Sequence, residues 1–166
     1  MERLEELACF YVAFLRSVSL QHQNAHWLAR GDNFYGTHLL FERLYKSSQE
    51  DVDLAAEKMV GLFGNECLDL KMQAEMIGKI LKQFSAESSV EMSLAAEKKF
   101  LDISQKFYDK VKEADKMTLG LDDMIMAIAS KREEACYLLQ QTLKTAQEKS
   151  SKLAARKVLL KRFAKK

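Results

Sequence analysis

The chain has 166 residues, of which 48% are hydrophobic and 30% are charged, and it contains six Gly and no Pro. This length suits a single domain, and the hydrophobic fraction excludes an intrinsically disordered protein. So few turn-forming residues argue against an all-β fold. The three cysteines, Cys9, Cys67 and Cys136, are too scattered for a disulfide framework or a zinc site, so we expect free thiols in a reducing compartment.

The N-terminal sequence and the hydropathy pattern bear on localisation. The first residues are acidic where a secretory signal would be basic, and Arg16 interrupts the first apolar stretch. No segment reaches the roughly 18 uninterrupted apolar residues of a membrane-spanning helix. We therefore expect a soluble, cytoplasmic protein.

The net charge of +2 hides an uneven distribution. Residues 151–166 hold seven of the 26 basic residues and no acidic residue, which leaves 19 basic and 24 acidic residues, a charge of −5, on the rest of the chain. The seven are Lys152, Arg156, Lys157, Lys161, Arg162, Lys165 and Lys166. An acidic body with a basic tail is therefore the main feature of the charge pattern.

Apolar residues recur at helical spacing along most of the chain. In the first half they predict a helix over about 2–29, which Gly31 stops, and a second helix over about 34–62. Asp32 or Asn33 is suited to be the N-cap of the second helix because a short polar side chain can accept a hydrogen bond from a free backbone N–H.

The second half of the chain predicts two further long helices. A less regular connection follows the second helix and contains a short helix over about 67–80. Ser88 and Glu91 have the spacing of a capping box, which predicts the start of a third helix over about 89–114. A fourth helix is predicted over about 119–149.

Four long helices joined by a long link between the second and the third predict an all-α fold of a particular kind. A link that traverses the bundle allows the second and third helices to run parallel, which is the ferritin-like connectivity. We assign residues 1–149 to this four-helix bundle. Residues 150–166 form a separate basic tail, which has the composition of a short amphipathic helix.

The residues that carry chemistry lie near the first helix connection. The three histidines, His22, His26 and His38, fall within 17 residues. The second helix adds two pairs at i, i+4 spacing, His38 with Glu42 and Asp53 with Glu57, each pair on one helical face.

The two pairs point in nearly the same direction, but about 16 Å separates them at about 1.5 Å per residue. One metal site therefore cannot use both pairs of one chain. Two copies of the second helix packed antiparallel about a twofold axis would bring the pairs together, with His26 beside them, in two equivalent sites. Imidazole with several carboxylates and open positions suits Fe(II) better than structural zinc. An isolated i, i+4 pair is usually a solvated helix face, so a bundle without metal function is the alternative interpretation.

Taken together, these residues resemble the signature of a known family, the Dps mini-ferritins. The matching pattern is His26-Trp27-x-x-x-Gly31-x-Asn33-Phe34-x-x-x-His38-x-x-x-Glu42, followed by Asp53-x-x-Ala56-Glu57. The resemblance implies a shell of twelve subunits with ferroxidase sites at its dimer interfaces. It implies that His26, His38, Asp53 and Glu57 bind iron and that Trp27 is the aromatic residue beside the site, which makes these five the candidate catalytic residues. Glu42 stands where the family commonly has Asp, as a ligand or a partner through water.

The resemblance also implies the reaction. Paired Fe(II) ions would be oxidised by hydrogen peroxide, less readily by dioxygen, and Fe(III) would be stored as a mineral inside the shell. Asp122 and Asp123, at the start of the fourth helix, lie near the positions where the family lines its pores, and a favourable interaction with the helix dipole is the alternative role for both. His22, one turn before His26, is an additional candidate for contact with metal, and a buried core histidine is the simpler interpretation.

The basic tail admits three interpretations. It is a solvated or subunit-packing helix, or it contacts the phosphates of DNA without sequence preference, or it lies on a membrane surface, which is the weakest of the three. Twelve copies on one shell would favour avid, salt-sensitive DNA binding, in which case the protein would be associated with the nucleoid. A protein that mainly compacts DNA through this tail is thus the alternative to an iron-oxidising one.

Overall fold

The computed structural model describes the backbone of residues 4–163 and the side chains of residues 4–156. Within this range all regular structure is helical, which confirms the predicted fold class. The elements are α1 (Leu4–Trp27), α2 (Phe34–Phe63), the 3-10 helix η1 (Asn65–Leu68), α3 (Leu70–Leu81), α4 (Ser89–Glu113) and α5 (Leu119–Phe163). None of these helices has the length and hydropathy together that a membrane span requires.

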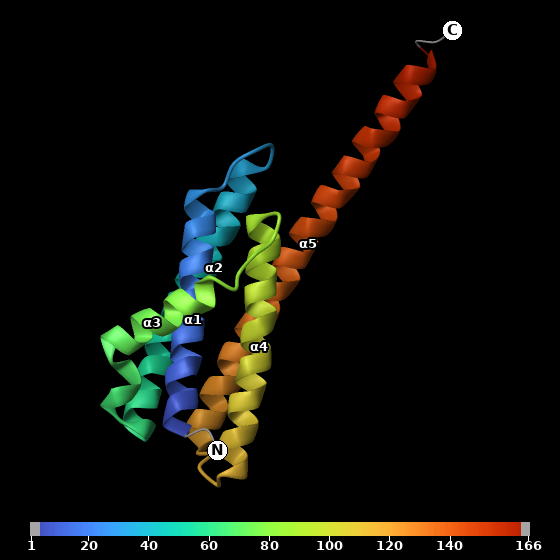
Figure 1. The fold of residues 1–166 in the computed structure, drawn as a ribbon. Helices are drawn as coiled ribbons and strands as arrows, with labels where there is room; N and C mark the ends of the chain where they lie inside the picture. Colours follow the sequence, from blue (N-terminus) through green and yellow to red (C-terminus); the bar gives the residue numbers. More distant parts are fainter. Residues whose placement is uncertain (1–3, 164–166) are drawn as a thin grey trace.

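The four long helices have the connectivity that the sequence predicts. In Figure 1, α1 and α5 run in one direction, and α2 and α4 run in the other. The connection between α2 and α4 contains η1 and α3, which pack against α1, and then returns to the opposite end of the bundle. This long return is what makes α2 and α4 parallel, as in ferritin-like bundles.

Local signals account for two of the helix ends that position the bundle. Ser88 and Glu91 form the predicted capping box: the Ser88 hydroxyl accepts a hydrogen bond from the Glu91 backbone N–H, and the Glu91 carboxylate accepts one from the Ser88 N–H. Gly31 has φ = +93°, a conformation that favours glycine, in the short turn between α1 and α2. This turn folds α2 back along α1, so that the C-terminal end of α1 lies beside the N-terminal end of α2.

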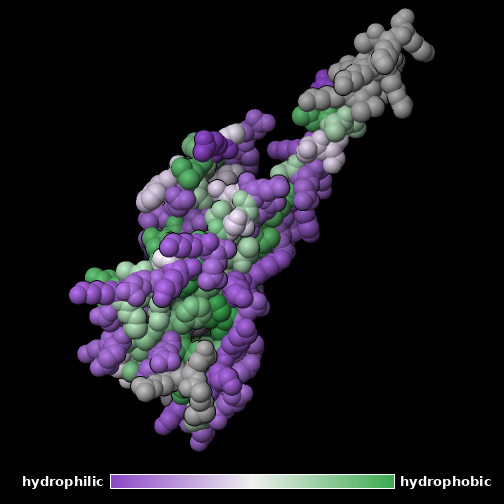
Figure 2. Space-filling model, viewed as in Figure 1, coloured by the Kyte–Doolittle hydropathy of each residue, from purple (hydrophilic) through white to green (hydrophobic). Residues whose placement is uncertain are grey.

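The last helix is longer than predicted. We expected it to end near residue 149, but α5 continues without interruption to Phe163. The physical reason is the absence of a stop signal, because no Gly or Pro occurs after Gly120. As far as Phe163, the tail therefore continues the fourth long helix. Its outer part stands clear of the body of the molecule (Figures 1 and 2).

A polar layer divides the hydrophobic core into two clusters. The larger cluster is centred on the aromatic rings of Tyr11, Phe100 and Phe107, and the smaller one contains Phe41 and Leu139. Between them, each long helix contributes one fully buried charged or titratable side chain to the centre of the bundle. These residues are His22, Asp51, Glu97 and Arg132.

The three cysteines are buried and free, as predicted. The Cys67 thiol donates a hydrogen bond to the Glu5 backbone carbonyl oxygen at 3.6 Å, and burial raises the pKa of Cys67 to about 12. The buried Gln73 amide on α3 donates to the backbone carbonyls of Cys9 (3.0 Å) and Cys67 (2.9 Å), and so holds α3 against α1. These interactions are structural, since a protonated buried thiol is a poor nucleophile and a poor metal ligand.

Candidate metal centre

The centre of the candidate site is a pair of stacked histidine rings. His26, near the end of α1, and His38, in the first turns of α2, have ring centroids 3.8 Å apart at an interplanar angle of 25°. Each ring is fixed by the backbone of the other: His26 Nδ1 lies 2.9 Å from the His38 carbonyl oxygen, and His38 Nδ1 lies 3.1 Å from the His26 carbonyl oxygen. The turn at Gly31 makes this reciprocal arrangement possible.

The two hydrogen bonds determine which ring nitrogen is available for a metal ion. A carbonyl oxygen only accepts, so each Nδ1 must carry the proton and donate. In the neutral imidazole, the lone pair then lies on Nε2, which is the atom that can bind a metal ion. A ring whose other nitrogen donates to a backbone carbonyl is the usual arrangement of a metal-binding histidine. The donor chemistry of the pair therefore fits Fe(II).

Glu42 lies one turn after His38 on the same side of α2. Its Oε1 accepts a hydrogen bond from Lys46 Nζ at 2.5 Å, in an i, i+4 ion pair. Lys46 is the main reason why the pKa of Glu42 is lowered, and His26 and His38 lower it further. Glu42 is thus an ionised carboxylate one turn after His38. Lys46 was missed by the sequence analysis, although the Glu-x-x-x-Lys spacing on a helix was visible.

Asp53 and Glu57 lie three turns further along α2. Both are exposed, and neither has an ion-pair partner among residues 4–156. Asp51, only two residues before Asp53, is fully buried, so α2 turns one carboxylate into the core and the other two outward. These two exposed carboxylates, which form no ion pair within the described residues, are accessible to a second molecule on the outer face of α2.

The structure brings part of the predicted set together within one chain and leaves the rest apart. His26 and His38 are in contact, and Glu42 lies one turn after His38 on α2. Asp53 and Glu57 stand about 16 Å further along the helix axis. Within the described part of the chain, no group of three or more His, Cys, Asp or Glu side chains is close enough to hold a metal ion. The described part of one chain therefore does not bring all the predicted ligands together.

The outer surface near these residues is unusually apolar. Trp27, directly after His26, is 68% exposed, and Leu39 and Leu54 on α2 are also exposed. Other exposed apolar side chains at this end of α1 and α2 are Leu28, Phe34 and Tyr35. Exposed apolar side chains gathered beside unpaired carboxylates are typical of a surface that another subunit covers.

His22 is part of the polar layer, and its Nε2 is already occupied. It lies 2.7 Å from Glu97 Oε1, and both side chains are fully buried. The Arg132 guanidinium contacts the same Glu97 oxygen at 3.2 Å and Asp51 Oδ2 at 3.1 Å, and Asp51 Oδ1 also accepts from Lys131 Nζ at 2.7 Å. In this position His22 is a core residue, and the sequence analysis did not identify its partners.

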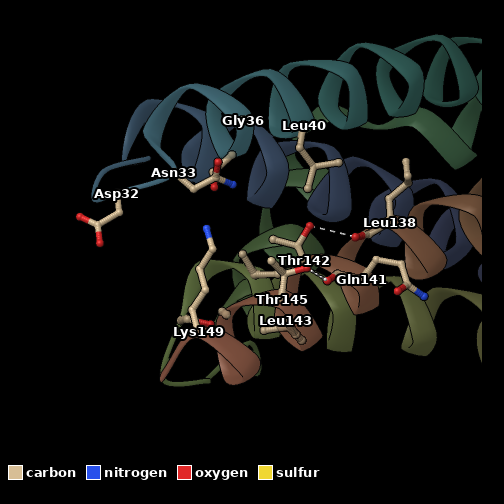
Figure 3. Close-up of a pocket in the computed structure, with 14 residues that line it drawn as sticks. Asp32, Asn33, Gly36, Leu40, Leu138, Gln141, Thr142, Leu143, Thr145 and Lys149 are labelled. Atoms are coloured by element: carbon tan, nitrogen blue, oxygen red, sulfur yellow. Dashed lines mark hydrogen bonds between the residues drawn. The ribbon is translucent and has the colours of Figure 1, made fainter. Parts of the chain in front are cut away.

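One groove of the described surface lies apart from the candidate metal ligands. It has a volume of about 660 Å³ and lies between the start of α2, the start of α4 and the outer half of α5 (Figure 3). The hydroxyl groups of Thr142 and Thr145 in its wall donate to carbonyls of their own helix, at 2.9 Å each. None of the candidate metal ligands lines it. We therefore do not assign the chemistry of the protein to this groove.

Comparisons with known proteins agree with this geometry. No protein-family model matches the chain. It is 28% identical to the DNA protection during starvation protein of Brevibacillus brevis over 123 residues, which cover 72% of this chain and 80% of the relative. It is also 28% identical to DNA protection during starvation protein 2 of Bacillus anthracis, over 72% of this chain and 82% of the relative.

A solved structure shows the same fold. The crystal structure of a Dps protein from Bacillus brevis superposes with a TM-score of 0.69 at 24% identity, over 86% of this chain and 99% of that chain. The ferritin-like connectivity, the stacked histidine pair with its free Nε2 atoms and the two starvation-protein relatives all point to one assignment. The chain is thus similar in sequence to DNA protection during starvation proteins and has the fold of the Dps mini-ferritins.

Proposed function

We propose that this protein oxidises Fe(II) at sites shared between two subunits and stores the Fe(III) inside a shell of twelve subunits, in addition to the general role in iron storage and DNA protection that its family supports. Each site would combine His26, His38 and Glu42 of one chain with Asp53 and Glu57 of another. The observation that carries the proposal is the division of one ligand set between two ends of α2, with the carboxylate end unpaired and exposed.

An antiparallel pair of α2 helices is the arrangement that reunites the set. A twofold axis midway between the two ends brings the histidine end of each helix to the carboxylate end of the other, and so creates two equivalent sites. The exposed apolar side chains of α1 and α2 would be buried along the same seam. Burial between subunits would also exclude water and strengthen the attraction between the carboxylates and a cation.

The chemistry requires two iron ions to be held close together. Two Fe(II) ions each give one electron to a single hydrogen peroxide, which takes up two protons and becomes two water molecules. Because both electrons arrive together, no hydroxyl radical is released. The carboxylates would stabilise the higher charge of Fe(III), and Trp27, which follows His26 in the sequence, would donate an electron to an oxidant that the two iron ions do not reduce.

Acidic residues would guide iron into the shell. Asp122, in the first turn of α5, and Asp123, directly after it, are the candidates for the lining of an entry pore. A ring of carboxylates contributed by several subunits would concentrate cations at its mouth.

The proposal predicts that activity and assembly coincide. In size-exclusion chromatography with light scattering, the main species should have about twelve times the 19.0 kDa mass of one chain, and peroxide-dependent Fe(II) oxidation should elute with it. Leu54→Arg, a change at an exposed position beside Asp53, serves as the matched seam variant, because it keeps every proposed ligand. It should shift the protein to smaller species and lose the fast oxidation. A single chain that oxidises Fe(II) at the full rate would contradict the proposal.

A second candidate function is DNA binding through the basic tail. Lys152 and Arg156 are exposed on the part of α5 that stands clear of the body. The side chains of Lys157, Lys161, Arg162, Lys165 and Lys166 lie outside the described residues. A cationic helix repeated on one shell supports contact with the phosphates of DNA, with an affinity that falls steeply as salt rises.

Deletion of residues 151–166 should abolish the gel shift of linear DNA at low salt. A variant in which the seven basic residues of the tail are replaced by Gln keeps the length of the helix, and it should lose the gel shift as well, because charge drives the binding. Light scattering of both variants verifies that the shell is intact. Full retention of DNA affinity by either variant would exclude the tail as the DNA contact.

A further inference from the structure

Lys46 lies beside the candidate centre, and no role has been given to it so far. It lies one turn after Glu42 on α2, and its Nζ donates to Glu42 Oε1 at 2.5 Å. Its side chain is 59% exposed, and that of Glu42 is 32% exposed. The ammonium group thus approaches the carboxylate from the solvent side, the side that a second subunit and a metal ion would approach.

This ion pair occupies an oxygen atom that the metal ion would need. Glu42 lies one turn after His38 on α2, and the Nδ1 hydrogen bonds of His26 and His38 leave both Nε2 atoms for a cation. A divalent cation bound between Glu42 and the imidazoles would lie within a few ångströms of the Lys46 ammonium group. Like charges at such a separation repel appreciably, even where water screens them.

We propose that Lys46 is a positioning residue that occupies the Glu42 carboxylate in the absence of iron, and that it thereby sets the affinity of the shared site for divalent cations. The inference rests on the proposed function, because it presupposes that Glu42 belongs to a metal site. Lys46 has a long, flexible stem, so its ammonium group can turn into solvent when a cation takes its place. The same ammonium group can return to Glu42 when the metal ion leaves.

The consequence is that the site binds iron more weakly than its ligands alone would allow. Weak retention suits a centre whose product has to move on into the shell, because each ion must vacate the ligands before the next one binds. The flexible ion pair supplies a replacement cation at that moment, so Glu42 is not left as an unpaired charge on a partly covered surface.

Zinc binding to the assembled protein tests this inference without any redox chemistry. Zn²⁺ takes the same nitrogen and oxygen donors as Fe(II), and isothermal titration calorimetry measures its affinity directly. Lys46→Gln should bind Zn²⁺ about three- to tenfold more tightly than the native chain, because the competing ammonium group is gone. Lys46→Arg keeps the positive charge and should bind within about twofold of the native chain.

Two further variants separate this inference from the proposed function. Arg43→Gln also removes one positive charge from α2, at the residue directly after Glu42. Because Arg43 forms an ion pair with Glu134 of α5 and not with Glu42, Zn²⁺ affinity should stay within about twofold of the native value. His26→Ala combined with His38→Ala should abolish the binding. Binding by Lys46→Gln that is equal to or weaker than that of the native chain overturns the role of Lys46 alone. Failure of the native chain to bind Zn²⁺ in a histidine-dependent way overturns both the inference and the proposed site.

Discussion

Two inactive variants of this protein should regain activity when their subunits are combined in one shell. His26→Ala with His38→Ala removes both imidazole ligands, and Asp53→Ala with Glu57→Ala removes the exposed carboxylates. Each variant alone should lose at least about a hundredfold in the rate of Fe(II) oxidation by peroxide, since loss of a ligand exceeds the 10- to 100-fold effect of removing a ligand's supporting partner.

The recovery follows from the division of the ligands between subunits. In a dimer with one subunit of each kind, one site receives intact histidines from one chain and intact carboxylates from the other, and the second site receives neither. Random mixing in equal amounts makes half of the dimers mixed, so about a quarter of all sites should be active. A site built from one chain would give no recovery at all.

The experiment has simple controls. The two variants are co-expressed or refolded together, and the rate is compared with that of the separately assembled shells mixed afterwards, which cannot exchange ligands. Glu50→Ala, which removes an exposed carboxylate of α2 outside the proposed set, should leave the rate unchanged. Mixed shells no more active than the parents would show that the two ends of α2 do not share a site.

The spacing of the sequence was sufficient to predict the fold and the group around His26. Helical periodicity, the capping box at Ser88 and the turn at Gly31 are local signals, and each is fulfilled in the structure. The proximity of His26 and His38 follows from two helices and one short turn, so it too was accessible from the sequence. The pairing of α2 with a second copy stays a prediction, because it depends on contacts that one chain does not contain.

Other features depend on contacts that are distant in sequence. Glu97 is 75 residues from His22 and 35 residues from Arg132, and no spacing rule joins them. The predicted end of the fourth helix, near residue 149, was based on the change to a basic composition, and the helix continues through that change to Phe163. Charged residues favour a solvated helix as readily as a loop, and only a Gly or Pro would have marked an end.

The second large effect is expected on the free energy of unfolding, and it arises from the polar layer in the centre of the bundle. Replacement of Arg132 by Met should lower the free energy of unfolding by about 3–5 kcal/mol, because the buried Glu97 loses its cationic partner and Asp51 keeps only Lys131. The matched control is Arg43→Met, which breaks the exposed ion pair with Glu134 and should cost less than about 1 kcal/mol. Urea unfolding at one protein concentration measures both, since the stability of an assembled protein depends on concentration.

A compensating change distinguishes lost charge pairing from lost packing. Glu97→Gln, added to Arg132→Met, removes the unpaired buried carboxylate but restores no volume, so it should recover part of the lost stability. A double variant that is less stable than Arg132→Met would mean that Glu97 is stabilised mainly by His22, whose Nε2 lies 2.7 Å away. The buried charged residues of the four helices are thus expected to stabilise the fold as one unit, with the Arg132 guanidinium as the cation between Glu97 and Asp51. This unit lies at the centre of the bundle, whereas the proposed iron site lies at its surface.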